Sequence, residues 1–128
     1  MKYLLDSHVF VWLFAKPSLV GDTTKSLLSN IDSEVFVSLA SLWELELKFS
    51  KGRFAYSAVK LQKAMNELGV SELVIRRDHI LASSSTKIEH TDPFDLMLCA
   101  QAKSEGMTLV TADKLLLSAF PDSIDAQL

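Results

Sequence analysis

Four acidic residues in separate parts of the chain have the types and positions that a metal-dependent hydrolytic site needs. Asp6 directly follows the apolar run KYLL, and Asp113 follows TLV after two intervening residues. Glu44 lies among apolar neighbours in SLWELELK, and Asp95 ends the motif DPFD. Carboxylate oxygens are hard ligands that select Mg²⁺ or Mn²⁺. A divalent ion held in this way activates water and stabilises the charge that develops on a phosphodiester during hydrolysis.

Taken one at a time, these acids also have structural explanations. Asp6 and Asp113 can cap the helices that follow them, a common use of aspartate at a strand-to-helix junction. Glu44 can pair with Lys48 at i,i+4, which stabilises a helix by about 0.3–0.5 kcal/mol. For any single acid the structural explanation is favoured, and only the combination favours a site.

The motif DPFD contains both explanations within four residues. Asp92 suits the N-cap of a helix, Pro93 suits its first position, and Asp95 suits the positive helix end. A helix started by Asp92 and Pro93 also fixes the direction in which Asp95 points. We therefore expect Asp95 to be a metal ligand and Asp92 to organise the helix that carries it.

Alternating strands and helices must position these acids. Apolar and β-branched runs predict strands at 2–5, 33–38, 72–76 and 107–111, with a last edge strand at 123–128. Helical patterns cover 7–15, 23–30, 38–52, 56–69, 77–86, 93–105 and 113–120. Gly52, Gly69 and Gly106 are expected to end helices, and Asp78 is expected to cap one. This alternation predicts an α/β fold with a parallel sheet covered on both faces.

In such a sheet, sites form beyond the carboxyl ends of the strands. Asp6 and Asp113 fall at such ends, while Glu44 and Asp95 lie early in helices, so the four acids can converge on one edge. Carboxylates brought together raise one another's pKa unless a cation neutralises them. An acidic site without a metal would also repel a polyanion. The constellation therefore indicates metal-dependent hydrolysis of phosphodiester bonds.

The length, net charge and cysteine content of the chain further limit the class of protein. The chain has 128 residues, which fits a single domain over 1–128. Its formal charge of −3 argues against a broad electrostatic coat for nucleic acid. No apolar run approaches the roughly 20 residues that span a bilayer, and the start of the chain lacks a signal-peptide cleavage site. Cys99 is the only cysteine, so no internal disulfide forms. We expect a cytoplasmic protein without a membrane partner.

Three stretches resemble successive blocks of one family: YLLDSHVFVWL, SLASLWELELKFSKGRF and HTDPFDLMLCAQAKSEGMTLVTAD. They are similar to the PIN-domain family, in particular to the VapC-type toxins of toxin–antitoxin pairs. The blocks occur in the order of the family and cover nearly the whole chain. The resemblance implies a three-layer α/β/α fold with a central, mainly parallel sheet of four or five short strands. It also implies an endoribonuclease that depends on Mg²⁺ or Mn²⁺.

The resemblance assigns roles to particular residues. It makes four acids catalytic metal ligands, in chain order Asp6, Glu44, Asp95 and Asp113. It makes Asp92 accessory, and it allows Ser7 and Thr111 to hydrogen-bond metal-bound waters or the ligating carboxylates. It further implies RNA as substrate, a homodimer, and inhibition by a small cognate antitoxin protein.

The chain departs from the family at two positions. Members often carry an arginine after DPFD and a basic residue between the histidine and the first aspartate, where this chain has Leu96 and Thr91. Two positive charges near the site are thereby absent. The cations that remain as candidate RNA phosphate contacts are Lys48, Lys51, Arg53, Arg76 and Arg77. Each of them is explained equally well as a solvated surface cation.

Other polar and aromatic residues are weaker candidates for a catalytic role. His8 is interpreted as a residue on the rim of the site, and His90 as a hydrogen-bonding residue at the start of a helix. Trp12, Trp43 and Phe94 are interpreted as core or interface aromatics.

Two other classes of function use the same acids. A phospho-acceptor signalling module also places acids and Mg²⁺ at strand ends, but here no Asp-Asp pair follows the first strand and no lysine closes the last core strand. In a catalytically silent interaction domain the acids would serve only as helix caps. The metal-dependent endoribonuclease toxin is the leading hypothesis.

Overall fold

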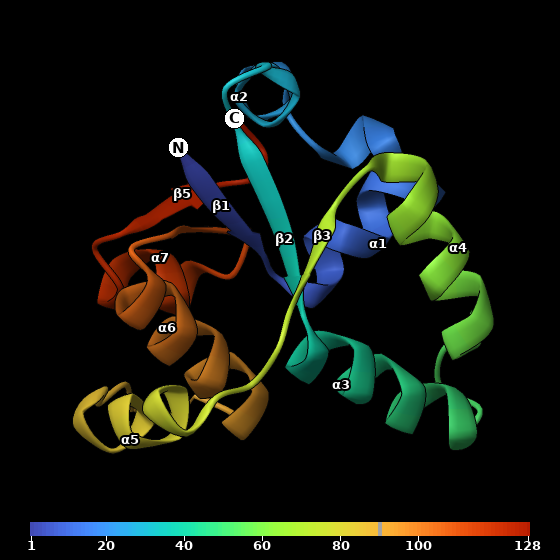
Figure 1. The fold of residues 1–128 in the computed structure, drawn as a ribbon. Helices are drawn as coiled ribbons and strands as arrows, with labels where there is room; N and C mark the ends of the chain where they lie inside the picture. Colours follow the sequence, from blue (N-terminus) through green and yellow to red (C-terminus); the bar gives the residue numbers. More distant parts are fainter. Residues whose placement is uncertain (90) are drawn as a thin grey trace.

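A computed structural model of the chain describes residues 1–89 and 91–128, and within them a parallel sheet lies between two layers of helices (Figure 1). The five strands run in the order β3-β2-β1-β4-β5, and every neighbouring pair is parallel. The α/β/α architecture predicted from the sequence is confirmed. The strands are β1 (Lys2–Leu5), β2 (Glu34–Ser38), β3 (Ser71–Leu73), β4 (Thr108–Thr111) and β5 (Ser123–Asp125).

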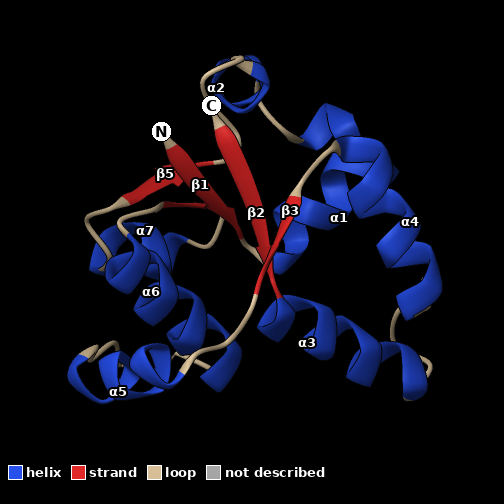
Figure 2. Cartoon of the chain, viewed as in Figure 1, coloured by secondary structure: helices blue, strands red, loops and turns tan. Residues whose placement is uncertain are grey.

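Helices cover both faces of this sheet (Figure 2). Helices α1, α3 and α4 lie toward one side in Figure 1, and α5, α6 and α7 toward the other. Their bounds are α1 (Ser7–Ala15), α2 (Asp22–Ser29), α3 (Leu39–Ser50), α4 (Ala58–Leu68), α5 (Arg77–Ser85), α6 (Pro93–Glu105) and α7 (Lys114–Ala119), with a 3₁₀ turn η1 (Pro17–Leu19).

The sheet separates two hydrophobic cores. Side chains of a strand alternate between its faces, so Tyr3 and Leu5 of β1 enter one core while Leu4 enters the other. The first core is completed by residues of α1, α3 and α4, including Phe10. The second is completed by residues of α6 and α7, including Leu98. Because helices cover both faces, the central strands β1 and β4 are buried beyond their first residues, whereas the edge strands β3 and β5 are more exposed.

Three details of the predicted elements need correction. The strand expected at 72–76 ends at Leu73, because β2, its partner in the sheet, ends where Ser38 pairs with Leu73. Asp78 does not cap α5. The N-cap is Arg76, whose backbone N–H donates to Nδ1 of His79 at 3.0 Å. The expected edge strand at 123–128 is present only as the three residues of β5.

The parallel arrangement brings the carboxyl ends of β1, β2 and β4 to the same edge of the sheet, the lower one in Figure 1. Helix α3 begins at the residue after β2, α1 begins two residues after the end of β1, and α7 begins three residues after the end of β4. In the described part of the chain, none of the helices has both the length and the apolar character needed to cross a membrane.

Candidate active site

Asp6 lies in the turn between β1 and α1 and is only 5% exposed. One carboxylate oxygen accepts the backbone N–H of His8 at 2.7 Å, which makes Asp6 the N-cap of α1. The other accepts the hydroxyl of Thr111 at 2.6 Å. Burial raises the pKa of Asp6, but hydrogen bonds from His8 and Thr111 outweigh that effect and hold the pKa below its ordinary value. Asp6 is thus a buried carboxylate kept in its charged form.

Glu44 projects from the second turn of α3 and is 7% exposed. Its Oε1 accepts the hydroxyl of buried Ser7 at 2.6 Å, and its Oε2 lies 3.2 Å from Nζ of Lys48. The expected i,i+4 pair with Lys48 is therefore present. A charge this buried needs such partners, because desolvation is costly for an unpaired carboxylate. Both oxygens of Glu44 are fixed in direction by groups from α1 and α3.

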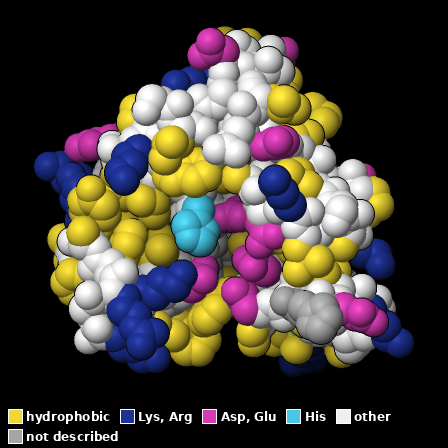
Figure 3. Space-filling model, turned by 180° about the vertical axis from the view of Figure 1, so that it is seen from behind, with side chains coloured by type: hydrophobic (Ala, Val, Ile, Leu, Met, Phe, Trp, Pro, Cys, Tyr) yellow, Lys and Arg dark blue, Asp and Glu magenta, His cyan; other side chains and the backbone are white. Residues whose placement is uncertain are grey.

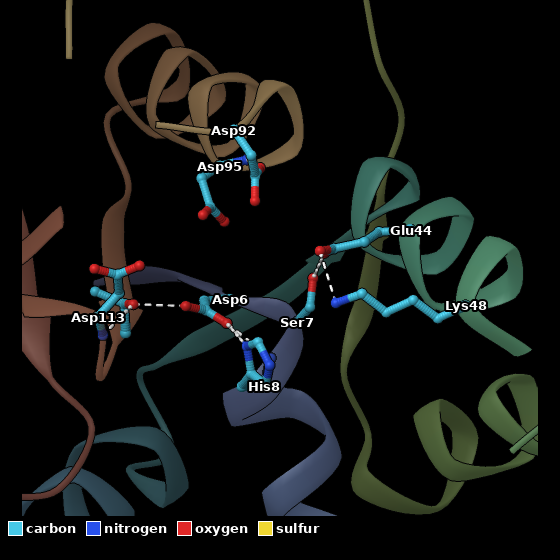
Figure 4. A network of polar contacts seen from close by, with 9 residues as sticks. Asp6, Ser7, His8, Glu44, Lys48, Asp92, Asp95 and Asp113 are labelled. Atoms are coloured by element: carbon cyan, nitrogen blue, oxygen red, sulfur yellow. Dashed lines mark hydrogen bonds and ion pairs between the residues drawn. The ribbon is translucent and has the colours of Figure 1, made fainter. Parts of the chain in front are cut away.

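Asp92 and Asp95 occupy the start of α6 and do different things there. Asp92 is the N-cap, and its Oδ1 accepts the backbone N–H of Asp95 at 2.8 Å. In Figure 4 the carboxylate of Asp95 points from α6 toward Asp6, with Asp113 to one side and Glu44 to the other. The expected division, in which Asp92 starts the helix and so aims Asp95, matches this geometry.

The pKa of Asp95 is raised to about 7. Burial is the largest cause, followed by the negative charges of Asp92, Asp6, Glu44 and Asp113. Four carboxylates from four separate segments therefore act electrostatically on the same side chain. The region carries more negative charge than its protein surroundings neutralise.

Asp113 is exposed, unlike the other three predicted ligands, and is the N-cap of α7. Its Oδ1 accepts the backbone N–H groups of Leu115 at 2.8 Å and Leu116 at 3.4 Å. Its own N–H donates to the hydroxyl of Thr111 at 3.1 Å. Because that hydroxyl also donates to Asp6, Thr111 links the two acids that follow β1 and β4.

The structure brings the four predicted acids to one edge of the sheet (Figure 4). Figure 3 shows acidic side chains gathered beside a histidine near the middle of this face. As the side chains stand, no three carboxylate, imidazole or thiol groups among residues 1–89 and 91–128 lie close enough to hold one ion. The donor set nevertheless fits a hard divalent cation, since it consists of carboxylates and its excess negative charge raises the pKa of Asp95. Their role as metal ligands remains a prediction.

His8 lies at the rim, as interpreted from the sequence, with its side chain 69% exposed. Its Nδ1 is 3.7 Å from Oδ1 of Asp6, and this partner raises the pKa of the imidazole above its ordinary value. Asp6, His8, Trp12, Ala112 and Asp113 line a small pocket of about 260 Å³. His90, the other histidine considered, lies outside the described residues.

The predicted cations fall into two sets. Lys48 is tied to Glu44 inside the site, whereas Lys51 and Arg53 are exposed just after α3. Arg76 and Arg77 are exposed at the start of α5. Figure 3 shows lysine and arginine side chains gathered to one side of the acids.

Sequence reasoning missed a buried polar network that joins α3, α5 and α6. Ser38, the N-cap of α3, donates to Oε1 of Gln101 at 2.6 Å. Nε2 of Gln101 lies 3.3 Å from Nδ1 of His79, whose Nε2 lies 2.8 Å from Glu105. Gln101 and His79 are fully buried. The signal in the sequence was a glutamine inside the apolar run LMLCAQA, because a buried glutamine needs hydrogen-bond partners.

Of the two alternatives for Trp43, core or interface, the structure excludes the core. The residue is 61% exposed, and its aromatic partner among the described residues is the half-buried Phe94. Trp12 is partly buried against the first core. Cys99 is buried in the second core, and burial raises the pKa of its thiol to about 12, so it is no nucleophile.

Fold and site together define a small α/β protein with an acidic centre at the carboxyl edge of a parallel sheet. The family model of the PIN domain matches residues 3–119, and the chain therefore belongs to the PIN-domain family. The resemblance noted in the sequence is confirmed at this level. A search of curated proteins gives no significant match.

Solved structures share the fold at low sequence identity. The chain is similar to VapBC2 from Rickettsia felis bound to a promoter DNA fragment, with a TM-score of 0.71 and 19% identity over 98% of this chain and 97% of the other. VapBC-1 from nontypeable Haemophilus influenzae gives a TM-score of 0.69 and 19% identity over the full length of both chains. A toxin–antitoxin complex from Klebsiella pneumoniae gives a TM-score of 0.65 and 18% identity over 95% of each chain.

Proposed function

We propose that this chain is a VapC-type toxin, an endoribonuclease that hydrolyses RNA phosphodiester bonds with Mg²⁺ or Mn²⁺. The observation that carries the proposal is the placement of Asp6, Glu44, Asp95 and Asp113 at one edge of the sheet, where the negative charges of the other acids raise the pKa of Asp95. Membership of the PIN-domain family supports it, as does the similarity of fold to chains from VapBC and toxin–antitoxin complexes.

In this proposal the metal is held by Asp6, Glu44, Asp95 and Asp113, and when bound it supplies Lewis-acid stabilisation and an activated water. The protein holds these carboxylates in place before substrate arrives. Thr111 fixes Asp6, the N-cap geometry of α6 aims Asp95, and Ser7 with Lys48 fixes Glu44. These contacts limit the conformations of the carboxylates, which would lower the cost of bringing them onto one ion.

Substrate and partners follow from the same proposal. Exposed Lys51 and Arg53 beyond α3 can neutralise RNA phosphates, and Arg76 and Arg77 are a second candidate pair. We further propose that the chain acts in the cytoplasm as a single domain over 1–128, forms a homodimer, and is inhibited by a small cognate antitoxin. The toxin–antitoxin complexes of similar fold support the last point.

The test is RNA cleavage by purified wild type, Asp6→Asn and Asp95→Asn in Mg²⁺, in Mn²⁺ and in excess chelator. We expect cleavage by wild type only with metal, and a loss of at least about 100-fold in either variant, since each removes a charge acting on the reacting phosphodiester. Circular dichroism must show that the variants remain folded. Equal cleavage by wild type and folded variants would show the proposal to be wrong. Asp32→Asn, in the exposed turn before β2, makes the same acid-to-amide change away from the site and is the matched control.

A further inference from the structure

An aromatic pair, formed by exposed Trp43 and half-buried Phe94, lies beside the acids. The rings of Trp43 on α3 and Phe94 on α6 meet edge to face, with centroids 5.7 Å apart and planes at 71°. The other aromatic pairs among the described residues, Phe10–Phe14, Phe14–Tyr56 and Phe54–Tyr56, are all associated with the first hydrophobic core. Neither Trp43 nor Phe94 belongs to either core, so packing of the fold does not explain the pair.

The pair is adjacent to the acidic site through both helices. Trp43 directly precedes Glu44, and Phe94 directly precedes Asp95. Consecutive helical residues differ by about 100° in direction, so each ring occupies the helix face next to the one that carries the acid. The contact between Trp43 and Phe94 therefore joins α3 to α6 next to the positions of Glu44 and Asp95. Figure 3 shows hydrophobic side chains directly beside the acidic ones on this face.

Trp43 is open to a ligand. It is 61% exposed, although the next residue, Glu44, is only 7% exposed. A large exposed aromatic beside a reactive centre is the arrangement that single-strand nucleic-acid binders use, because every base presents a π-face for stacking. The edge-to-face contact with Phe94 limits the motion of the indole, so less conformational entropy is lost when a base stacks on it.

The charge of this region also favours an RNA base over a phosphate group as the ligand of Trp43. The chain carries a net charge of −3, and the residues next to Asp92 and Asp95, Thr91 and Leu96, are uncharged. The electrostatic attraction of RNA to this part of the site is therefore weak, and uncharged contacts at Trp43 would add to the binding energy. Stacking supplies it at about 1–3 kcal/mol per base without requiring a particular sequence.

Building on the proposed ribonuclease function, we propose that Trp43, braced by Phe94, is a stacking subsite for the base of a nucleotide next to the scissile phosphate. A base that stacks on a side chain must be unpaired. The substrate class is therefore single-stranded RNA, or the unpaired loop of a structured RNA. Trp43 is a positioning residue here, since it holds the substrate and does not touch the reacting atoms.

The test measures KM and kcat on a short single-stranded RNA that carries the mapped cleavage site, for wild type, Trp43→Leu and Trp43→Phe. Stacking binds ground state and transition state alike, so Trp43→Leu should raise KM roughly 5- to 150-fold with little change in kcat. Trp43→Phe should recover most of that loss because it keeps an aromatic face. Val59→Ala, which alters a 77% exposed apolar side chain on α4, should leave KM unchanged.

A matched set of RNAs, each with one abasic nucleotide, locates the base. One abasic position beside the cleaved bond should raise KM for wild type by a similar factor and have almost no further effect on Trp43→Leu, because either change alone removes the stacking interaction. Full additivity of the two effects on KM would overturn the stacking subsite. So would an unchanged KM in Trp43→Leu.

The result also separates this inference from the function on which it rests. If wild type cleaves no RNA with Mg²⁺ or Mn²⁺, both proposals are wrong. If wild type cleaves RNA and Trp43→Leu does so equally well, only the stacking subsite is wrong. If Trp43→Leu loses activity together with a change in oligomeric state by sedimentation, the aromatic pair covers a second copy of the chain and the base assignment is overturned.

Discussion

The hydroxyl of Thr111 donates a hydrogen bond of 2.6 Å to the buried carboxylate of Asp6, which lies 105 residues earlier in the chain. The same hydroxyl accepts the backbone N–H of Asp113 at 3.1 Å. Parallel pairing of β1 with β4 makes both contacts possible, because it brings the carboxyl ends of the two strands side by side. One side chain thus fixes the relative placement of two candidate metal ligands.

Thr111→Val should destabilise the protein by about 1–3 kcal/mol, because it keeps the shape of the side chain but leaves the Asp6 carboxylate without one partner. The pKa of Asp6 is lowered in the folded state, so its contribution to stability is present above the unfolded value of 3.8 and is lost as pH falls through the folded value. The difference between wild type and Thr111→Val should therefore be larger at neutral pH than at acid pH in urea unfolding. Thr111→Ser keeps the hydroxyl and should remain close to wild type.

Asp95 should make the metal-free protein less stable as pH rises. Its folded pKa of about 7 lies above the ordinary 3.8, so the folded state binds more protons and stability falls between about pH 4 and 7. Asp95→Asn should abolish this fall and stabilise the metal-free protein at alkaline pH. Mn²⁺ should stabilise wild type more at pH 8 than at pH 5. It should stabilise Asp95→Asn much less than wild type at either pH. Thermal melts with and without Mn²⁺ test this, and a pH-independent Mn²⁺ effect would contradict it.

Asp92→Asn should reduce RNA cleavage less than Asp95→Asn does. Asparagine caps helices about as well as aspartate, so α6 should still begin at Pro93 and aim Asp95 correctly. Asp92→Ala removes the cap and should cost about 1 kcal/mol of stability in addition. Cleavage rates and urea midpoints of the three variants distinguish loss of a metal ligand at Asp95 from loss of the cap at Asp92 that orients it. A greater loss of activity in Asp92→Asn than in Asp95→Asn would reverse the roles of the two acids.

The placement of the acids could be predicted because it depends on a general property of parallel sheets. Short buried runs before Asp6 and Asp113 identified two strands, and parallel strands place their carboxyl ends at one edge. The same aspartates are helix caps, so the two explanations that competed in the sequence are compatible in the structure. Capping fixes the backbone on which the carboxylate is presented.

What the sequence did not reveal depends on contacts between distant segments. The end of the third strand after Leu73 is decided by the length of β2, which local propensity at Val74 and Ile75 does not report. The exposure of Trp43 depends on how α3 and α6 cross, and a tryptophan beside a buried acid reads equally well as core. Hydrogen-bond partners across the fold cannot be assigned from spacing alone.

The exposed cations beyond α3 should contribute to RNA binding in a salt-dependent way. Replacing both Lys51 and Arg53 by glutamine should raise KM for single-stranded RNA. It should also lower the slope of log KM against log salt by about 0.7 for each RNA phosphate that the protein no longer neutralises. Lys63→Gln, on the exposed face of α4, removes a charge away from the acids and should leave that slope unchanged. An unchanged slope in the double variant would identify Lys51 and Arg53 as solvated surface cations.

Gln101 should matter for activity although it touches none of the acids. It accepts a hydrogen bond from Ser38, the N-cap of the helix that carries Glu44, and it lies on α6, which carries Asp95. Gln101→Leu keeps much of the volume but leaves the Ser38 hydroxyl without its acceptor, and should cost about 1–3 kcal/mol of stability. His79 keeps its contacts with Arg76 and Glu105. Loosening α3 against α6 should also weaken Mn²⁺ binding by calorimetry. Gln101→Glu tests the network in a second way, because it retains an acceptor for Ser38 while losing the amide donor to the carbonyl of Val74 at 3.3 Å. If Gln101→Leu has the same stability and Mn²⁺ affinity as wild type, the network does not position Glu44 and Asp95.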